Sequence, residues 1–375
     1  MLEKGRISVG QAAIIAFAFA LGTGIFVLPA FEINWAREDA WLVQILITIP
    51  ILILVLIVDK LGRKFPEQTI VQYSETILGK YLGKVIGFAV TLFFFWTGSV
   101  ILYELAAFLV SCLMPDTPMS VFLSITGLLI AYTVYNGLET IGRLHVWFIP
   151  ITIGSLIIIT LLVSKEMDLN HFRPFLANGI APVLRGARTS NSYHGCMILA
   201  LAMLIPYVNQ PHRGKKAYLY AVIILSLIYG LNTAGCLAVF GPFEGGRISF
   251  PTVKLVKMIN IADIIQRIEV LLVLIWVGAV FTMSTAWFYF SVLGTAQLFN
   301  FKKYQLLVIP MIALYIGVSA LNYRSYPMFV DYVDRIWAPY AAVHEFLIPP
   351  FLLLVAVIRG LGVKNGIKSQ GAKQS

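Results

Sequence analysis

The chain has 375 residues, of which 59% are hydrophobic and only 12% are charged, and its formal net charge is +10. A mean hydropathy of +0.85 excludes an ordinary soluble globular protein and predicts an integral membrane protein. The charge does not indicate a nucleic-acid partner, because lysine and arginine gather in alternate loops, as the positive-inside rule expects of a membrane protein.

Apolar runs of about the length that crosses a bilayer recur from end to end, which leaves no room for a large soluble domain. The ten expected spans are residues 9–31, 40–58, 85–112, 119–136, 144–163, 190–208, 217–240, 268–297, 304–322 and 341–358. We expect one all-α permease-like domain, residues 1–363, followed by a short basic cytoplasmic tail, residues 364–375. An even number of spans places both termini in the cytoplasm.

The first span contains Gly22-Thr23-Gly24, and Pro29 follows shortly after. Two glycines around a small hydroxyl weaken a helix, and hydrocarbon cannot satisfy the backbone groups that a break would free. One interpretation is a broken helix whose N–H groups face an anionic substrate, as in many transporters. The other is close packing of a continuous helix through its small residues.

The third span carries Glu104 deep in the apolar segment FFFWTGSVILYELAAFLV. Such a group costs a few kcal/mol in a membrane and usually faces the interior of the bundle. Glu104 is expected either to bind a ligand amine, a cation or a proton, or to make a structural hydrogen bond to another helix. Phe93 and Trp96 share one face of this helix and, with Tyr289 of the eighth span, are candidates for an apolar pocket wall, although ordinary packing explains most aromatic residues here.

The sixth span begins with the polar and small residues of TSNSYHGCMILALAMLIP. Two long outer segments lie nearby in the sequence: 164–189 precedes the sixth span, and 241–267 follows the seventh. Paired interrupted segments in two halves of a chain indicate a midplane binding site and favour an inverted repeat, here residues 9–163 and 190–358. His194 is expected to be a titrating gate or a structurally hydrogen-bonded residue. The 241–267 segment predicts an amphipathic helix at the outer interface, and His344 and Glu345 are expected to be solvated at the rim of the last span.

Signatures of enzymes and metal sites are absent from the sequence. There is no Ser-His-Asp spacing, no HExxH motif and no phosphate loop. The three cysteines, Cys112, Cys196 and Cys236, lie in apolar stretches and lack metal-ligand spacing. We therefore predict no catalysis, no metal and no cofactor.

Short motifs spread over nearly the whole chain match one family in order and spacing. They are ISVGQ at 7–11, LGTGIFVLP at 21–29, DAW at 39–41, FPEQTIVQYSETILGKYLGK at 65–84, PDTP at 115–118, NGLETIGR at 136–143, RPFLANGIAPVLRG at 173–186, FPT at 250–252 and QRIE at 266–269. The chain resembles the B subunit of spore germinant receptors, the GerAB/GerKB-type spore permeases of the amino acid–polyamine–organocation superfamily. The resemblance implies a LeuT-like five-plus-five inverted repeat with interrupted helices 1 and 6.

The resemblance also implies a role in the spore inner membrane. Such subunits sense a small nutrient, commonly an L-amino acid, together with an A-type membrane subunit and a C-type lipoprotein. The ligand carboxylate would meet backbone N–H groups at Gly22, Thr23 and Gly24, and Phe93 and Tyr289 would face the ligand.

The sequence departs from the family at two places. Many relatives carry an arginine near Tyr103, which here precedes Glu104, and many carry a glutamate after a glycine of the sixth span, where this chain has Gly195 and Cys196. The candidate ligand-binding residues are therefore Gly22, Thr23, Gly24, Phe93, Trp96, Tyr103, Glu104, Tyr193, Gly195, Cys196 and Tyr289.

Three functions compete at this point. The first is a nutrient-sensing receptor subunit that binds a germinant and signals by population shift. The second is a proton- or sodium-coupled amino acid transporter with Glu104 as its coupling site. The third is a scaffold that has lost ligand binding and stabilises its partners.

Overall fold

The computed structural model describes residues 2–112, 114–258, 268–321 and 326–362. Within these ranges every regular element is helical, and the one β-type contact is an isolated bridge between Ile7 and Val208. The prediction of an all-α protein is therefore confirmed. The predicted tail, residues 364–375, and residues 259–267 of the second outer segment lie outside the described residues.

Every expected span overlaps a helix, although the helices of the sixth and last spans begin earlier than expected. Their bounds are α1 Val9–Ala36, α2 Ala40–Lys64, α3 Ile70–Leu78, α4 Lys80–Cys112, α5 Met119–Tyr135, α6 Leu138–Leu162, α7 Ala181–Leu204, α8 Gly214–Glu244, α9 Pro251–Met258, α10 Ile268–Leu298, α11 Gln305–Leu321, α12 Tyr326–Tyr332, α13 Ala338–Ala342 and α14 Ile348–Ile358. In the described part of the chain, 6 helical stretches are long and apolar enough to cross a membrane, and α5 and α11 are shorter apolar helices. The number of crossings and the inverted repeat stay predictions.

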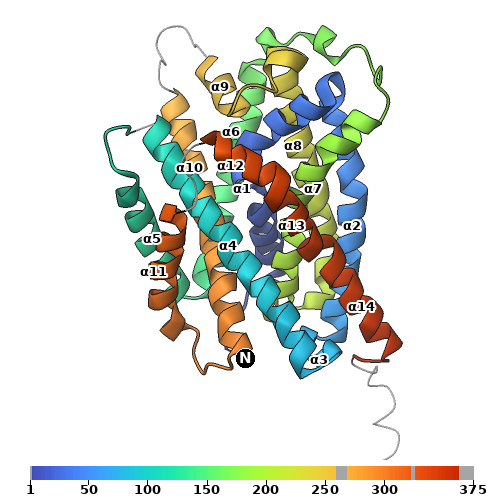
Figure 1. The fold of residues 1–375 in the computed structure, drawn as a ribbon, viewed down its shortest axis with the longest axis vertical. Coiled ribbons are helices and arrows are strands. Elements are labelled where there is room, and N and C mark those ends of the chain that lie inside the picture. Colours follow the sequence, from blue (N-terminus) through green and yellow to red (C-terminus); the bar gives the residue numbers. More distant parts are fainter. Residues whose placement is uncertain (1, 113, 259–267, 322–325, 363–375) are drawn as a thin grey trace, which may run out of the picture.

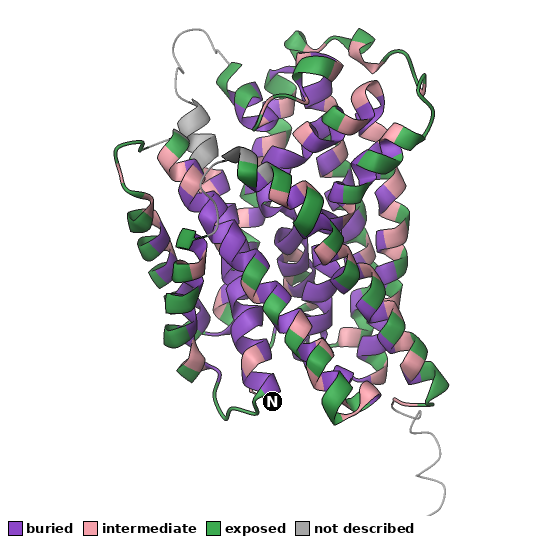
Figure 2. Cartoon of the chain, viewed as in Figure 1, coloured by how far each residue is buried: buried purple, intermediate pink, exposed green. Residues whose placement is uncertain are grey.

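The helices form one bundle with α1 at its centre, in contact with α6, α7, α8 and α10 (Figure 1). In Figure 1 the lower end of the bundle holds the N-terminus and α3, and the upper end holds α9 and the chain between α6 and α7. Buried residues concentrate along the middle of the bundle, whereas α5 and α11 at its edge expose large apolar side chains (Figure 2). That distribution suits a bundle whose rim faces lipid.

The predicted interruption of the first span is wrong, because α1 is helical without a break through Gly22, Thr23 and Gly24. The two glycines serve close packing instead. A Cβ atom at Gly22 would lie 1.6 Å from Met283 Sδ, and one at Gly24 would lie 2.2 Å from Tyr229 Oη. Small residues at these positions let α8 and α10 approach the backbone of α1, which is the packing alternative drawn from the sequence.

Pro29 leaves one carbonyl group of α1 without its helical donor. Proline has no N–H, so the C=O of Ile25 cannot bond to the residue four positions later. The side chains of Asn232 (Nδ2, 2.6 Å) and Thr252 (Oγ1, 2.8 Å) donate to this oxygen. The defect that proline introduces into α1 is therefore satisfied from α8 and α9.

The predicted interruption of the sixth span is also wrong, since α7 is helical throughout. Irregular backbone occurs in the last span, where the π-helical turns η6 (Val333–Trp337) and η7 (Val343–Leu347) separate α12, α13 and α14. Pro339 and Pro349 follow these turns. Because proline has no backbone N–H, the carbonyl group four residues before each proline lacks its usual helical donor. A π turn accommodates such a loss, and π turns are frequent at functional sites.

Candidate ligand-binding site

A small cavity lies beside the middle of α1, between α1, α4, α7, α10 and the last span. Its lining residues are Phe19, Ala20, Thr23, Thr97, Val100, Ile101, Glu104, Tyr193, Cys196, Met283, Trp287, Phe329, Val333 and Trp337. The space that a water molecule can enter is about 20 Å³, which is enough for about one water. This space is far smaller than an amino acid.

Thr23 and Glu104 form the polar centre of this cavity. The hydroxyl of Thr23 on α1 and the carboxyl of Glu104 on α4 both line it. The structural alternative for Glu104, a hydrogen bond to another helix, stays a prediction. The Glu104 side chain also lines the cavity, and no ion pair of the described residues includes it. A buried carboxyl in this setting is arranged to accept a proton or the ammonium group of a ligand.

Tyr193 and Cys196 bring α7 into the same cavity. The ring of Tyr193 packs edge-on against Trp337 at a centroid distance of 4.9 Å, and the Nε1 of Trp337 donates to Thr97 Oγ1 (3.1 Å). Four of the predicted contacts, namely Thr23, Glu104, Tyr193 and Cys196, thus meet at one place. Three helices that are distant in sequence supply them.

Glu345 was expected at a solvated rim, and that expectation is wrong. Its side chain is fully buried, and the Cys196 thiol donates to its Oε1 (3.2 Å). The carboxylate that the sixth span lacks is therefore supplied beside Gly195 and Cys196 by the last span. The sequence signal for this turn is Pro349, which lies four residues after Glu345 and forces the π turn that carries it.

Glu32 is a further buried carboxyl of the bundle, besides Glu104 and Glu345. It is fully buried on α1 and accepts hydrogen bonds from Gln44, Ser190 and Thr233. No spacing in the sequence marks this group, because its partners lie on three other helices. Glu32 directly follows the expected first span, residues 9–31.

Seven predicted contacts lie outside the cavity wall: the glycines Gly22, Gly24 and Gly195, and four aromatic residues, Phe93, Trp96, Tyr103 and Tyr289. Phe93 is buried and stacks on His344 at a centroid distance of 4.7 Å. Trp96 is 36% exposed, and its Nε1 donates to Tyr332 Oη (2.5 Å). Buried His194 bonds through Nδ1 to the C=O of Ser190 (3.0 Å), which matches its structural alternative. The ligand contacts of Phe93, Trp96, Tyr103 and Tyr289 stay predictions.

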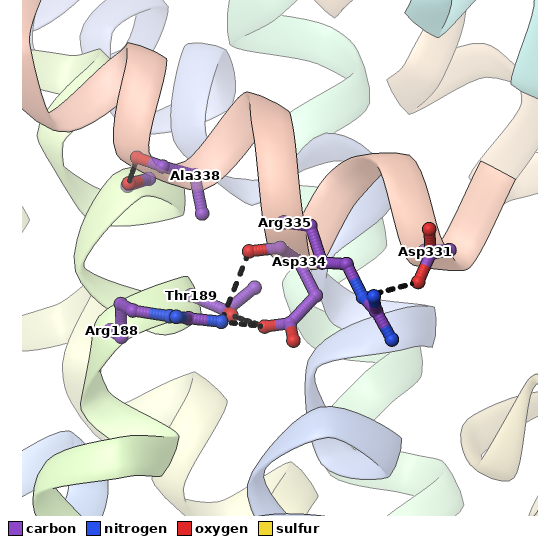
Figure 3. Close-up of polar contacts among 7 residues, drawn as sticks. Arg188, Thr189, Asp331, Asp334, Arg335 and Ala338 are labelled. Carbon is purple, nitrogen blue, oxygen red and sulfur yellow. Dashed lines mark hydrogen bonds and ion pairs between the residues drawn. The ribbon is translucent and has the colours of Figure 1, made fainter.

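The upper end of the bundle is closed by contacts between α7 and the last span (Figure 3). Asp334 of η6 accepts from Arg188 (3.0 Å, an ion pair) and from the Thr189 hydroxyl (2.7 Å), and Ser192 Oγ donates to the C=O of Ala338 (2.8 Å). We name these contacts the upper closure. Beside it lies a polar hollow of about 450 Å³ whose wall includes Asp334.

The lower end is closed by the N-terminal segment. The Glu3 carboxyl accepts from the hydroxyls of Tyr289 and Tyr304 (both 3.1 Å) and from the backbone N–H of Leu138 (3.3 Å). The backbone of Ile7 bonds to the chain that follows α7. This arrangement places Tyr289 in a seal at the lower end.

Among the residues of the described ranges, no group of three or more histidine, cysteine, aspartate or glutamate side chains is placed to hold a metal ion. A carboxyl that can accept a cation, a hydroxyl, and an apolar wall are the chemical resources of the cavity. Binding sites for small molecules combine an apolar wall with a few polar groups in this way.

Comparisons with known sequences agree over most of the chain. A family model described as "Spore germination protein" matches residues 6–326. Spore germination protein YndE of Bacillus subtilis (strain 168) is 27% identical, over 93% of this chain and 96% of that protein. Spore germination protein KB of the same strain is 26% identical, over 95% of this chain and 96% of its own length.

Solved structures with a similar helical arrangement include a transporter. Mhp1, a nucleobase-cation-symport-1 family transporter in a closed conformation with bromovinylhydantoin bound, matches with a TM-score of 0.71 at 13% identity, over 93% of this chain and 78% of that one. MhsT in complex with L-phenylalanine matches with a TM-score of 0.64 at 15% identity, over 96% of this chain and 91% of that one. At such identities the likeness concerns the fold alone.

Proposed function

This chain belongs to the spore germination protein family, and from that premise we propose that it is the permease-like subunit of a germinant receptor. It lies in the spore inner membrane with both termini in the cytoplasm, and it binds a small germinant in the cavity beside Thr23. The observation that carries this proposal is the buried carboxyl of Glu104, which lines one small cavity together with Thr23.

The cavity chemistry favours an L-amino acid. Glu104 is a buried acid that would pair with the ligand amine, and a charge-assisted bond of this kind is stronger than a neutral one. The rings of Phe19, Trp287 and Trp337 form an apolar wall that would take an aliphatic side chain. Met283 also lines the cavity, and its flexible thioether can move aside to make room.

The ligand carboxylate requires a local change in α1. In the closed form the N–H groups of Gly22, Thr23 and Gly24 belong to a continuous helix. Neighbouring side chains already donate to carbonyls of this stretch. The donor–acceptor pairs are Tyr229 to Ala20 (2.7 Å) and Leu21 (3.0 Å), and Trp276 to Gly22 (3.3 Å).

These bonds lower the cost of unwinding α1, because the carbonyl groups would keep partners while the N–H groups became free. The freed N–H groups would then meet the ligand carboxylate. Ligand binding therefore selects a form with a locally opened α1, and that change in population is the signal to the partner subunits. The partners are an A-type membrane subunit and a C-type lipoprotein.

Ligand binding to the purified chain tests the proposal. The chain in lipid nanodiscs would be titrated with each common L-amino acid while tryptophan fluorescence is recorded, since Trp287 and Trp337 line the cavity. We expect saturable quenching or enhancement with one ligand class and none in a Trp287→Phe, Trp337→Phe double variant. Absence of any saturable change with all ligands, combined with normal germination of spores whose receptor carries Thr23→Val, contradicts the proposal.

A coupled transporter is the second candidate, because a buried carboxyl in the cavity can also carry a coupling proton or cation. Uptake of a labelled ligand into proteoliposomes that contain this chain alone separates the two. Gradient-driven accumulation supports transport, and saturable binding without accumulation supports sensing.

A further inference from the structure

Glu32 is a carboxyl group buried within the bundle without a partner of opposite charge. It has no exposed surface, and none of the ion pairs among the described residues includes it. An ionised carboxylate in the interior of a membrane protein is costly unless several donors or a cation accompany it. The groups around Glu32 therefore decide what it can bind.

Three neutral donors reach Glu32 from three helices. They are Gln44 Nε2 of α2 (2.5 Å), Ser190 Oγ of α7 (2.5 Å) and Thr233 Oγ1 of α8 (2.6 Å). A metal ion lies about 2.0–2.6 Å from each of its oxygen ligands. Two oxygens that share an ion are therefore farther apart than the Glu32 carboxyl oxygens are from these three donors. The cluster has the dimensions of O–H···O contacts, which accommodate a proton.

Gln44 provides an independent observation. Its side chain is 2% exposed, and its Oε1 is buried without a hydrogen-bond partner among the described residues. Rotation of the terminal amide brings this oxygen to Glu32, where a protonated carboxyl can donate to it. The ionised carboxyl accepts from the amide nitrogen instead. Gln44 thus offers a matching partner to either protonation state.

We propose that Glu32 is a proton-binding site and that its occupancy controls the upper closure. Ser190 and Thr189 are consecutive on α7, and successive helical side chains point in different directions. Ser190 bonds to Glu32 on one side, and Thr189 bonds to Asp334 on the other. A protonated Glu32 is a weaker acceptor for Ser190, which loosens this part of α7 from α1 and opens the upper closure.

Among the described residues, α7 and α8 present titratable groups near Glu32. On α8 they are the Tyr229 hydroxyl, which donates to the C=O of Ala20, and the Cys236 thiol, which contacts Thr252. On α7, His194 lies one helical turn after Ser190, and its ring packs against Tyr229 at a centroid distance of 5.0 Å. The side chains that bond directly to Glu32, namely Gln44, Ser190 and Thr233, are neutral.

Infrared pH-difference spectra of the chain in lipid nanodiscs test proton binding. We expect a carbonyl band of a protonated carboxyl that rises as the pH falls and is lost in Glu32→Gln. Glu104→Gln and Glu345→Gln serve as matched controls, because each removes another buried carboxyl of the helical bundle and should keep the band. A band that survives in Glu32→Gln overturns the assignment.

Spin-label distances test the coupling to the upper closure. One label is placed at Leu184→Cys on α7 and the other at Ile336→Cys on η6. Both positions are exposed, and they lie on the two helical segments that the upper closure joins. Cys112 is replaced by serine so that it does not take up a label. Cys196 and Cys236 are kept, because they are buried. In the labelled parent we expect a longer distance population that appears at acidic pH and is absent at alkaline pH.

Two variants separate the acid from its link to the closure. Glu32→Gln should show the longer population at every pH, because it resembles the protonated state. Ser190→Ala should keep the infrared band and lose the pH dependence of the distance. A distance that responds to sodium rather than to pH, or a pH response that persists in both variants, overturns the proposal.

Discussion

Gly195 of α7 lies directly against Glu345 of the last span: a Cβ atom at Gly195 would be 2.1 Å from Glu345 Oε2 and 2.6 Å from its carboxyl carbon. The neighbouring Cys196 thiol donates to the other carboxyl oxygen. The small residue on α7 therefore makes room for an acid from another helix. A carboxylate reaches the sixth span in this protein although that span contains none.

Replacement of Gly195 by alanine should destabilise the protein. The added methyl group meets the carboxyl group of Glu345, and overpacking of a tight core typically costs about 1–3 kcal/mol. We expect a lower thermal unfolding midpoint of the purified chain in detergent. In a double-mutant cycle, Glu345→Ala should recover part of the loss, because it removes the carboxyl group that the methyl meets.

Gly154 of α6 offers the matched control. A Cβ atom there meets nothing within 4 Å, and alanine is favoured over glycine inside a helix. Gly154→Ala should leave the midpoint unchanged or raise it slightly. Equal effects of the two alanine substitutions would show that Gly195 and Glu345 are not in close contact.

The sequence predicted the helices well because each apolar run must satisfy its own backbone bonds in a membrane. The sequence also indicated Thr23, Glu104, Tyr193 and Cys196 as candidate ligand contacts, and these four residues line one cavity. Each of these is a polar, aromatic or small residue set in an apolar run, and such an anomaly is visible without a structure.

The state of the backbone could not be read in the same way. A glycine pair such as Gly22 and Gly24 serves a broken helix and a closely packed one equally well, and only Met283 and Tyr229, from distant segments, decide between them. Burial of Glu345 was missed because it depends on a π turn and on packing against α7. Distant contacts leave no pattern in the local sequence.

The carbonyl group that Pro29 orphans provides a second test. Asn232→Ala combined with Thr252→Val removes both side-chain donors to the C=O of Ile25. An unsatisfied buried carbonyl costs about 1–3 kcal/mol, so the unfolding midpoint should fall. Pro29→Ala restores a backbone N–H to the helix, and the same pair of substitutions should cost less in that background. An equal cost in both backgrounds would mean that the proline does not create the need for these donors.

Loss of the ion pair at the upper closure should open that end of the bundle. Asp334→Asn removes the partner of Arg188 and weakens the acceptor of Thr189. A partly exposed pair contributes up to about 1 kcal/mol, which corresponds to roughly a fivefold change in population. Spin-label distances between positions 184 and 336 should shift toward the longer population. Asp331→Asn is the matched control, because its pair with Arg335 lies within one helical segment, and it should leave the distances unchanged.

Glu104→Gln tests the proposed site most directly. The amide keeps the size of the side chain, but it loses the negative charge that would pair with a ligand amine. A hydrogen bond to a charged group contributes about 1.5–3 kcal/mol, so affinity for an amino acid germinant should fall roughly ten- to hundredfold. Fluorescence titration of the purified chain measures the loss, and the germination dose curve of spores with the same variant should shift to higher ligand concentration. Glu166→Gln, at an exposed position, should leave both measurements unchanged. If Glu104→Gln binds the ligand as tightly as the parent, the carboxyl serves only to join α4 to α1, and the ligand amine must be sought elsewhere in the cavity.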